Sequence, residues 1–374
     1  MAPLARRNLT HDRSRFAVTL AGVVFAIVLI TVQLGLFIGF TTTTSALVDH
    51  GGADLWITAA GTPNLDASPP FPERKIYAVR ATEGVAAAEP LIVQFTSWRR
   101  NDGVGESCEI VGIDVDQPMG RPWNIVAGRV EDLKLPDAVM IDELYLAKLG
   151  ITRLGQTVEI NDKRARVVGF TRGIRSFTTS PYVFTSLANA RKYAPRLRPD
   201  ETIYVVAKVG PGADVRDVQK RLRARLTDVD VLTAGEFAFR TQYYWMVTTG
   251  AGMAILLAAA MGLIVGVVII AQTTYATTMD HLKEYGTLKA MGASNGFVTR
   301  LILKQSAIAG SIGYAAGIAI SLAVAALSEA GQAAIRVPWP LAAGILVLTF
   351  AMCAAASLTS IRKVLSVDPA MVFQ

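Results

Sequence analysis

The stretch "FAVTLAGVVFAIVLITVQLGLFIGFTTTTSALV", residues 16–48, contains no Asp, Glu, Lys or Arg. Three more charge-free runs follow, at residues 241–279, 305–328 and 337–361. Each run exceeds the roughly 20 residues that a helix needs to cross about 30 Å of hydrocarbon. The chain has 374 residues, of which 52% are hydrophobic and only 18% charged, which is too apolar for a soluble domain of this size. The sequence therefore predicts an α-helical membrane protein with four transmembrane helices.

The first run follows a group of arginines, as the core of a secretory signal does. A signal core is only about 7–15 residues long, and this run is about twice that length. We therefore expect an anchor that is not cleaved. The arginines that precede it are Arg6, Arg7, Arg13 and Arg15.

Basic residues beside the four runs predict the orientation. They gather before the first run, between the second and third runs and after the fourth, whereas the loop between the third and fourth carries only Arg336 against Glu329. Both termini and segment 280–296 are therefore expected in the cytoplasm of a multi-pass inner-membrane protein. Aromatic residues expected in the outer interfacial belt are Tyr243, Tyr244, Trp245 and Trp339.

The long segment between the first two spans predicts a large mixed α/β extracytoplasmic domain. Expected strands are 54–58, 91–98, 108–113, 156–160, 165–170 and 202–209, and expected helices are 73–81, 142–149, 186–193 and 214–226. Asp142 and Asp214 are placed as N-terminal caps. The predicted divisions are 1–15 (cytoplasmic N-terminus), 16–40 (helix 1), 41–240 (periplasmic domain), 241–279 (helix 2 with a stalk), 280–296 (coupling segment), 297–328 (helix 3), 329–337 (periplasmic loop), 338–361 (helix 4) and 362–374 (cytoplasmic tail).

Catalytic, metal and cofactor sites are not expected. The three histidines, His11, His50 and His281, are scattered, and no Walker A motif is present. Residues 292–296 read G-x-S-x-G, but no histidine follows His281, so Gly292 is interpreted as a left-handed helix end and Ser294 or Asn295 as the next helix cap. Cys108 and Cys353 are not expected to pair. The basic run 216–225 lies on an amphipathic helix, which favours a solvated face over nucleic-acid binding.

Segment 280–291 has two faces if it is helical. Gly286, Ala290 and Ala293 share a side of small residues that permits close approach. A second stripe, with two apolar anchors and a carboxylate, consists of Glu284, Thr287, Leu288 and Met291. This pattern predicts a docking helix; the alternative is a linker that lies along the lipid surface.

The run "HLKEYGTLKAMGAS" (281–294) resembles the cytoplasmic segment of the FtsX/MacB-type ABC transporter permeases. The segments "ARRNLTHDRSRFAVTLAGVVFAIVLITVQLG" (5–35) and "SVDPAMVF" (366–373) are similar to the DevC-like branch. The resemblance implies a dimeric, non-enzymatic subunit that pairs with a separate ATPase, which binds ATP and Mg, and with a periplasmic adaptor and an outer-membrane duct. Only about fifteen residues precede the first span, so the ATPase is expected on another polypeptide. The implied ATPase-coupling residues are Glu284, Tyr285, Gly286, Thr287, Leu288, Lys289, Ala290, Met291, Gly292 and Ala293.

Three G-x-x-x-G pairs indicate close helix packing in lipid, within the chain or at a dimer seam formed by the first two spans. They are Gly35 and Gly39, Gly262 and Gly266, and Gly313 and Gly317. The first two charge-free runs overshoot a bilayer as helices, so they either extend as rigid stalks or tilt strongly.

Two functions fit this layout, and a stand-alone receptor that works without an ATPase is a third alternative. The first is the permease of an ATP-driven exporter that expels a lipid, glycolipid, peptide or hydrophobic compound. The second is an FtsX-like regulator in which the same movement switches an extracytoplasmic enzyme.

Overall fold

The computed structural model describes residues 13–280, 282–329, 331 and 334–365. The described chain forms two compact units. One comprises the residues up to Gly39, the stretch from Gly252 to Glu329 and the stretch from Ala334 onward, and the other runs mainly from Phe40 to Ala251. The branch-specific segments 5–12 and 366–373, together with His281, lie outside the described residues.

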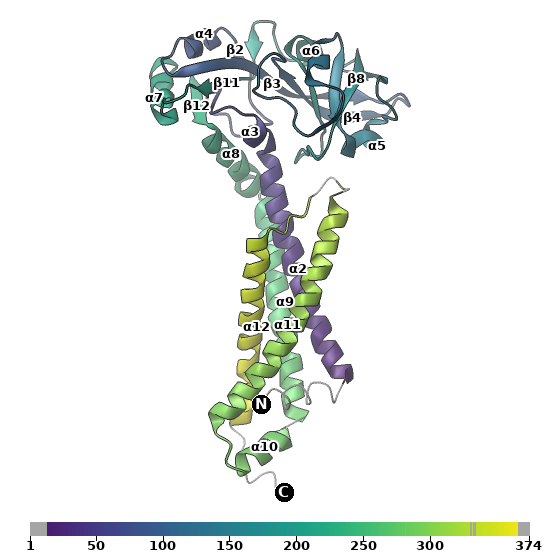
Figure 1. Cartoon of the computed structure of the whole chain (residues 1–374), viewed down its shortest axis with the longest axis vertical. Coiled ribbons are helices and arrows are strands. Elements are labelled where there is room, and N and C mark those ends of the chain that lie inside the picture. The colour runs from purple at the N-terminus through teal and green to yellow at the C-terminus, as the bar shows by residue number, and fades with distance from the viewer. Residues whose placement is uncertain (1–12, 281, 330, 332–333, 366–374) are drawn as a thin grey trace. The chain divides into compact units, whose positions relative to one another are not determined.

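Among the described residues, four long helices make up most of the first unit, and each is long and apolar enough to cross a membrane. They are α2 (Arg13–Thr44), α9 (Ala251–Asp280), α11 (Asn295–Ser328) and α12 (Trp339–Leu365). Figure 1 shows them running alongside one another, with the short helix α10 (Leu282–Ala290) at one end of the bundle. Buried polar bonds join neighbouring helices, such as the Ser306–Ser357 hydroxyl pair at 2.7 Å between α11 and α12.

The second charge-free run is not one continuous helix. It begins within α8 (Ala234–Tyr243), passes through a short π-helical segment η3 (Tyr244–Thr248) and breaks at Gly250 before α9 starts. Gly250 has φ +77°, a left-handed conformation that glycine adopts without steric cost. The chain therefore does not form the one continuous helix over residues 241–279 that the charge-free run predicted.

A ten-stranded mixed sheet organises the second unit, in the order β12-β1-β11-β3-β4-β9-β6-β8-β5, with β7 paired to β3 and β8. The pairs β4–β9 and β6–β8 are parallel, and the other pairs in the sheet are antiparallel. Its strands are β1 (Leu55–Ala59), β3 (Val85–Arg99), β4 (Gly105–Ile113), β5 (Ile125–Ala127), β6 (Ala138–Asp142), β7 (Thr157–Ile160), β8 (Lys163–Thr171), β9 (Tyr182–Ser186), β11 (Tyr204–Val209) and β12 (Val229–Thr233). A separate two-stranded sheet pairs β2 (Phe71–Pro72) with β10 (Glu201–Thr202).

Short helices cover this sheet on two hydrophobic cores. They are α3 (Ala46–His50), α4 (Lys75–Arg80), α5 (Leu146–Leu149), α6 (Leu187–Tyr193), α7 (Val215–Arg225) and the 3₁₀ turns η1 (Val130–Lys134) and η2 (Glu143–Tyr145). The predicted caps are confirmed, because Asp214 accepts backbone N–H bonds at the start of α7 and Asp142 does so at the start of η2. Cys108 and Cys353 are confirmed as free and buried.

Glu89 on β3 is a buried carboxyl group in the sheet, with 2% of its surface exposed. Burial raises its pKa to about 7, and the Asp114 carboxylate acts in the same direction. Arg80 and Arg121 oppose the shift. Because the folded pKa lies above the ordinary value of 4.5, the stability that the neutral form provides is complete below about pH 4.5 and is lost as the pH rises through about 7.

We expect Glu89→Gln to remove this loss. Above about pH 7 the variant should be more stable than the wild type by up to about 3 kcal/mol, whereas near pH 4.5 the two should unfold alike. Thermal unfolding of the full chain across this pH range measures the difference. Glu131→Gln, at an exposed glutamate, is the control that should follow the wild type. A difference in stability between Glu89→Gln and the wild type that does not change with pH would contradict the raised pKa of Glu89.

Candidate functional site

The predicted coupling segment forms α10 and a tight turn into α11. Gly292 has φ +95°, as predicted for a left-handed helix end. The N–H of Ala293 bonds to the carbonyl of Leu288 at 3.0 Å and closes this end of the helix. Ser294 caps α11 by accepting the N–H of Phe297, which decides between the two predicted caps.

One face of α10 packs into the chain itself. Tyr285 is only 1% exposed, and its hydroxyl donates to Oε1 of Gln305 on α11 at 3.1 Å. Leu288 packs beside it against the same apolar cluster. The buried members of that cluster from α11 and α12 are Val298, Leu301, Ile302, Ile361 and Val364. The inward face therefore ties α10 to the third and fourth long helices.

The opposite face is exposed and carries Glu284, Thr287 and Met291, the last with 72% of its surface exposed. These three residues, hereafter the outward face, belong to the predicted docking stripe. The fourth member, Leu288, points the other way into the bundle, because the cluster between α11 and α12 supplies it with apolar neighbours.

The predicted face of small residues is only partly open. Gly286 is buried within the chain, whereas Ala293 is half-buried, and the side chain of Ala290 lies outside what is described. A partner that approaches α10 therefore meets the outward face rather than Gly286.

Lys289 fastens α10 to the end of α12. Its Nζ donates to the carbonyl oxygens of Val364 and Leu365, both at 3.2 Å. A cation at these carbonyls also lies at the negative end of the helix dipole. Sequence reasoning placed Lys289 in the segment but did not identify this contact, since it depends on where α12 ends.

We expect Lys289→Met to free the last turn of α12. The loss of two carbonyl bonds and of the dipole interaction should cost about 1 kcal/mol and speed amide hydrogen exchange in that turn several-fold. Lys289→Arg, which keeps the cation and its donors, should restore protection. Unchanged exchange in the methionine variant would show that the contact does not hold the helix end.

Two of the predicted packing glycines join α11 to α2. A Cβ atom at Gly313 would lie 2.4 Å from Cγ1 of Val23, and one at Gly317 would lie 2.7 Å from Cγ2 of Ile27. Real Cβ atoms do not approach so closely, so the two helices touch through these glycines. This pair is an intrachain contact.

The glycines of α9 make the same kind of contact. A Cβ at Gly262 would lie 2.9 Å from Cδ2 of Leu29 on α2. One at Gly266 would lie 2.5 Å from Cβ of Ala26 and 2.7 Å from Cε of Met352 on α12. The bundle is therefore close-packed around α2.

Gly35 and Gly39 do not pack against another helix. They face the loop that leads into α12, where a Cβ at Gly35 would lie 2.8 Å from Cγ2 of Ile335 and one at Gly39 would lie 1.8 Å from the carbonyl oxygen of Ala334. The helix–helix interpretation of this pair is wrong, because the loop backbone occupies the space that the glycines open.

Two further packing glycines were not predicted. A Cβ at Gly22 on α2 would lie 2.2 Å from Cγ2 of Ile269 on α9, and one at Gly310 on α11 would lie 2.9 Å from Sγ of Cys353 on α12. Gly310 precedes Gly313 by three residues, a spacing that keeps both on one side of the helix. That spacing is the signal that could have identified it.

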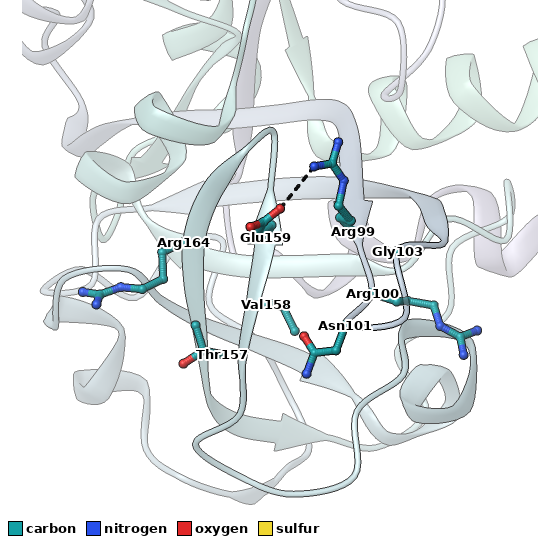
Figure 2. A pocket seen from close by; sticks show the side chains of 8 residues that line it. All are labelled: Arg99, Arg100, Asn101, Gly103, Thr157, Val158, Glu159 and Arg164. Atoms are coloured by element: carbon teal, nitrogen blue, oxygen red, sulfur yellow. Dashed lines mark hydrogen bonds and ion pairs between the residues drawn. The ribbon is translucent and has the colours of Figure 1, made fainter.

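A surface pocket of about 550 Å³ lies at the hairpin end of β3 and at β7. Its lining residues are Arg99, Arg100, Asn101, Gly103, Thr157, Val158, Glu159 and Arg164. Figure 2 shows Arg99 directed at Glu159, to which it is bonded at 3.3 Å. Arg100 and Arg164 are also ion-paired, at 2.7 Å and 3.1 Å, with carboxylates beside the pocket. Its arginines are therefore balanced by acids.

Family models match both parts of the chain. One described as the MacB-like periplasmic core domain matches residues 16–225, and one described as the FtsX-like permease C-terminal matches residues 236–369. The first begins at the start of the first charge-free run and includes most of the sheet unit. The second includes α9, α10, α11 and nearly all of α12.

Relatives in sequence agree with these matches. The chain is 24% identical over 384 residues to an uncharacterized ABC transporter permease of Mycobacterium tuberculosis, covering 99% of this chain and 98% of that protein. It is 25% identical over 209 residues to one of Methanocaldococcus jannaschii, covering 53% and 52% of the two chains. The periplasmic region of MacB from Actinobacillus actinomycetemcomitans aligns with a TM-score of 0.38 at 12% identity, covering 50% of this chain and 90% of that one. The chain belongs to the FtsX/MacB-type family of ABC transporter permeases.

Proposed function

We propose that this permease is the membrane subunit of an ATP-driven exporter. A separate ATPase docks on the outward face of α10, and its nucleotide-driven movement is relayed to the sheet unit to expel a lipid, glycolipid, peptide or hydrophobic compound. The single observation that carries the proposal is that α10 has one face exposed and the other locked into the bundle. ATP and Mg are bound by the partner, since a Walker A motif is absent from the sequence.

The packing of its inward face makes α10 move as a rigid body with α11 and α12. Its apolar side chains are packed with those of α11 and α12, and a packed core transmits displacement rather than absorbing it. The lysine contact at the end of α12 adds a polar link to the same helix. A push on the outward face therefore moves α11 and α12 together with α10.

The displacement then passes to α2 through the glycine contacts of α11. At these points the β-branched side chains of Val23 and Ile27 lie directly against the glycine backbone of α11, so a movement of α11 pushes on α2. Because α2 continues without a break to Thr44, beyond the first unit's limit at Gly39, it is the covalent route by which movement reaches the sheet unit.

The proposed assembly sits in the inner membrane with both termini and α10 in the cytoplasm, as the distribution of basic residues indicates. A homodimer is part of it. An exposed apolar stripe on α8 and η3 supports a second copy, because Phe239, Tyr243 and Val247 are 67%, 53% and 46% exposed at helical spacing. A periplasmic adaptor and an outer-membrane duct complete the exporter.

The experiment is co-expression with the ATPase encoded beside this chain. We expect the two to purify together in lipid nanodiscs, with the chain stimulating ATP hydrolysis. An adaptor gene in the same neighbourhood supports export, and a wall-hydrolase gene would favour the regulatory alternative instead. Failure of every neighbouring ATPase to bind would contradict the proposal.

A further inference from the structure

A fully buried carboxyl group lies in the sheet unit. Glu109 on β4 is 0% exposed, and neither of its carboxyl oxygens has a hydrogen-bond donor among the residues that the structure describes. A buried carboxylate without a donor is strongly unfavourable, and such groups take up a proton instead. The carboxyl of Asp66, from the loop between β1 and β2, faces Glu109 at hydrogen-bonding range.

The position of Trp245 decides which of the two acids holds the proton. The indole Nε1–H of Trp245 donates to Oδ2 of Asp66 at 2.9 Å. A donor stabilises the ionised form of the acid that it contacts. Asp66 is therefore the carboxylate, and Glu109 is the neutral acid whose O–H donates to it. This single proton fills the bond that no other donor supplies.

The groups around the pair carry hydroxyls rather than cations. Tyr182 on β9 and Tyr204 on β11 are fully buried beside it, and Tyr204 donates its hydroxyl to the carbonyl of Leu65 at 2.6 Å. Ser176 lies at Tyr182, and its N–H donates to the hydroxyl of Tyr145 at 3.3 Å. Within the described part of the chain, no lysine or arginine is paired with either acid.

Burial raises the pKa of Glu109 well above its usual range, and the charge of Asp66 raises it further. Burial also raises the pKa of Asp66, while the Trp245 and Glu109 bonds lower it. The directions match the assignment above. Asp66 keeps part of its surface in solvent, so the proton of Glu109 has a route to water.

Trp245 connects this acid pair to the segment that leads into α9. It lies in η3, just before the break that begins α9. Its ring also packs on Phe177 at 4.7 Å between centroids, and Phe177 packs on Phe40 of α2 at 3.8 Å. Asp66 is therefore hydrogen-bonded to Trp245. The Trp245 ring belongs to an aromatic cluster that joins the end of α2, the loop around Phe177 and the segment leading to α9.

We propose that Asp66 and Glu109 form a proton-binding site that fastens Trp245, and with it the segment leading into α9, to the sheet. With the proton bound, the acid pair and the indole form one continuous chain of hydrogen bonds. When Glu109 gives its proton to water, two carboxylates face each other in a buried site and repel, so Asp66 moves away and the Trp245 bond is broken. The site needs no ATPase and is independent of the proposed function.

The experiment follows the Trp245 indole resonance in the full chain in nanodiscs, using ¹⁵N-labelled tryptophan and Trp245→Phe for assignment. From about pH 5 to about pH 10, the wild-type resonance should shift and lose exchange protection with a midpoint above the usual carboxyl range. The neutral isostere Glu109→Gln keeps an N–H donor toward Asp66, so its resonance should stay in the protected position throughout.

Asp66→Asn adds a second readout that a merely structural contact would not move. The amide removes the charge opposite Glu109, so ionisation of Glu109 no longer sets two carboxylates against each other, and the pH transition of the Trp245 resonance should be lost. Glu131→Gln, at an exposed glutamate, should behave as the wild type does. A wild-type Trp245 resonance that does not change with pH would overturn the proposal. So would a pH transition of this resonance that persists in Glu109→Gln.

Discussion

Charge reversal on the outward face of α10 should weaken ATPase binding by about tenfold to a hundredfold. The double variant Glu284→Lys and Met291→Arg replaces an exposed carboxylate and an exposed apolar side chain with cations. An apolar anchor and a charge at the centre of an interface typically carry more than 1 kcal/mol each, and about 1.4 kcal/mol is tenfold in affinity. ATPase stimulation should fall in parallel. Titration of the purified ATPase into nanodiscs measures both quantities.

The fold should survive this change, because neither side chain belongs to the apolar cluster that holds α10. Thermal unfolding should therefore match the wild type. Glu131→Lys, a charge reversal on the exposed surface of the sheet unit, is the control that should leave ATPase binding intact. Full binding by the double variant would place the docking site elsewhere.

Leucine at Gly313 should strongly destabilise the helix bundle. Even a Cβ atom there meets the β-branched side chain of Val23, with 2.4 Å to Cγ1 and 2.9 Å to Cβ, so a leucine must push α2 and α11 apart. Overpacking of this kind costs about 1–3 kcal/mol. The thermal unfolding midpoint should fall by several degrees, and ATPase stimulation should fall with it if movement passes through this contact.

Gly344→Leu is the matched control. Gly344 lies in α12, where a Cβ would meet nothing within 4 Å, and leucine has the higher helix propensity. This variant should unfold at or slightly above the wild-type midpoint. Equal damage from the two leucines would mean that the short Gly313–Val23 distance does not control packing.

The four spans could be predicted because a charge gap of membrane length is a property of sequence alone. The longer strands, such as β3 and β4, were predicted from runs of β-branched and apolar residues. Short buried strands such as β6, β9 and β12 were missed, since three or four apolar residues within a five-residue stretch do not distinguish a strand from the end of a helix.

Within the candidate site, periodicity defined the stripes of α10 but not which stripe the chain itself would cover. Leu288 was assigned to a partner because the apolar cluster that receives it is completed by Ile361 and Val364 of α12, which lie far along the chain. Gly35 and Gly39 were misread for the same reason, since their neighbours lie in a loop. The Asp66–Glu109 pair joins a loop to a strand and depends entirely on the tertiary fold.

A photocrosslinking residue at position 291 tests the central claim most directly. In nanodiscs that contain this chain and its ATPase, illumination should produce an adduct between residue 291 and the ATPase. The same group at position 344, exposed on α12 within a membrane span, should produce none. If residue 291 gives no adduct while the complex is intact, the outward face of α10 is not where the ATPase acts.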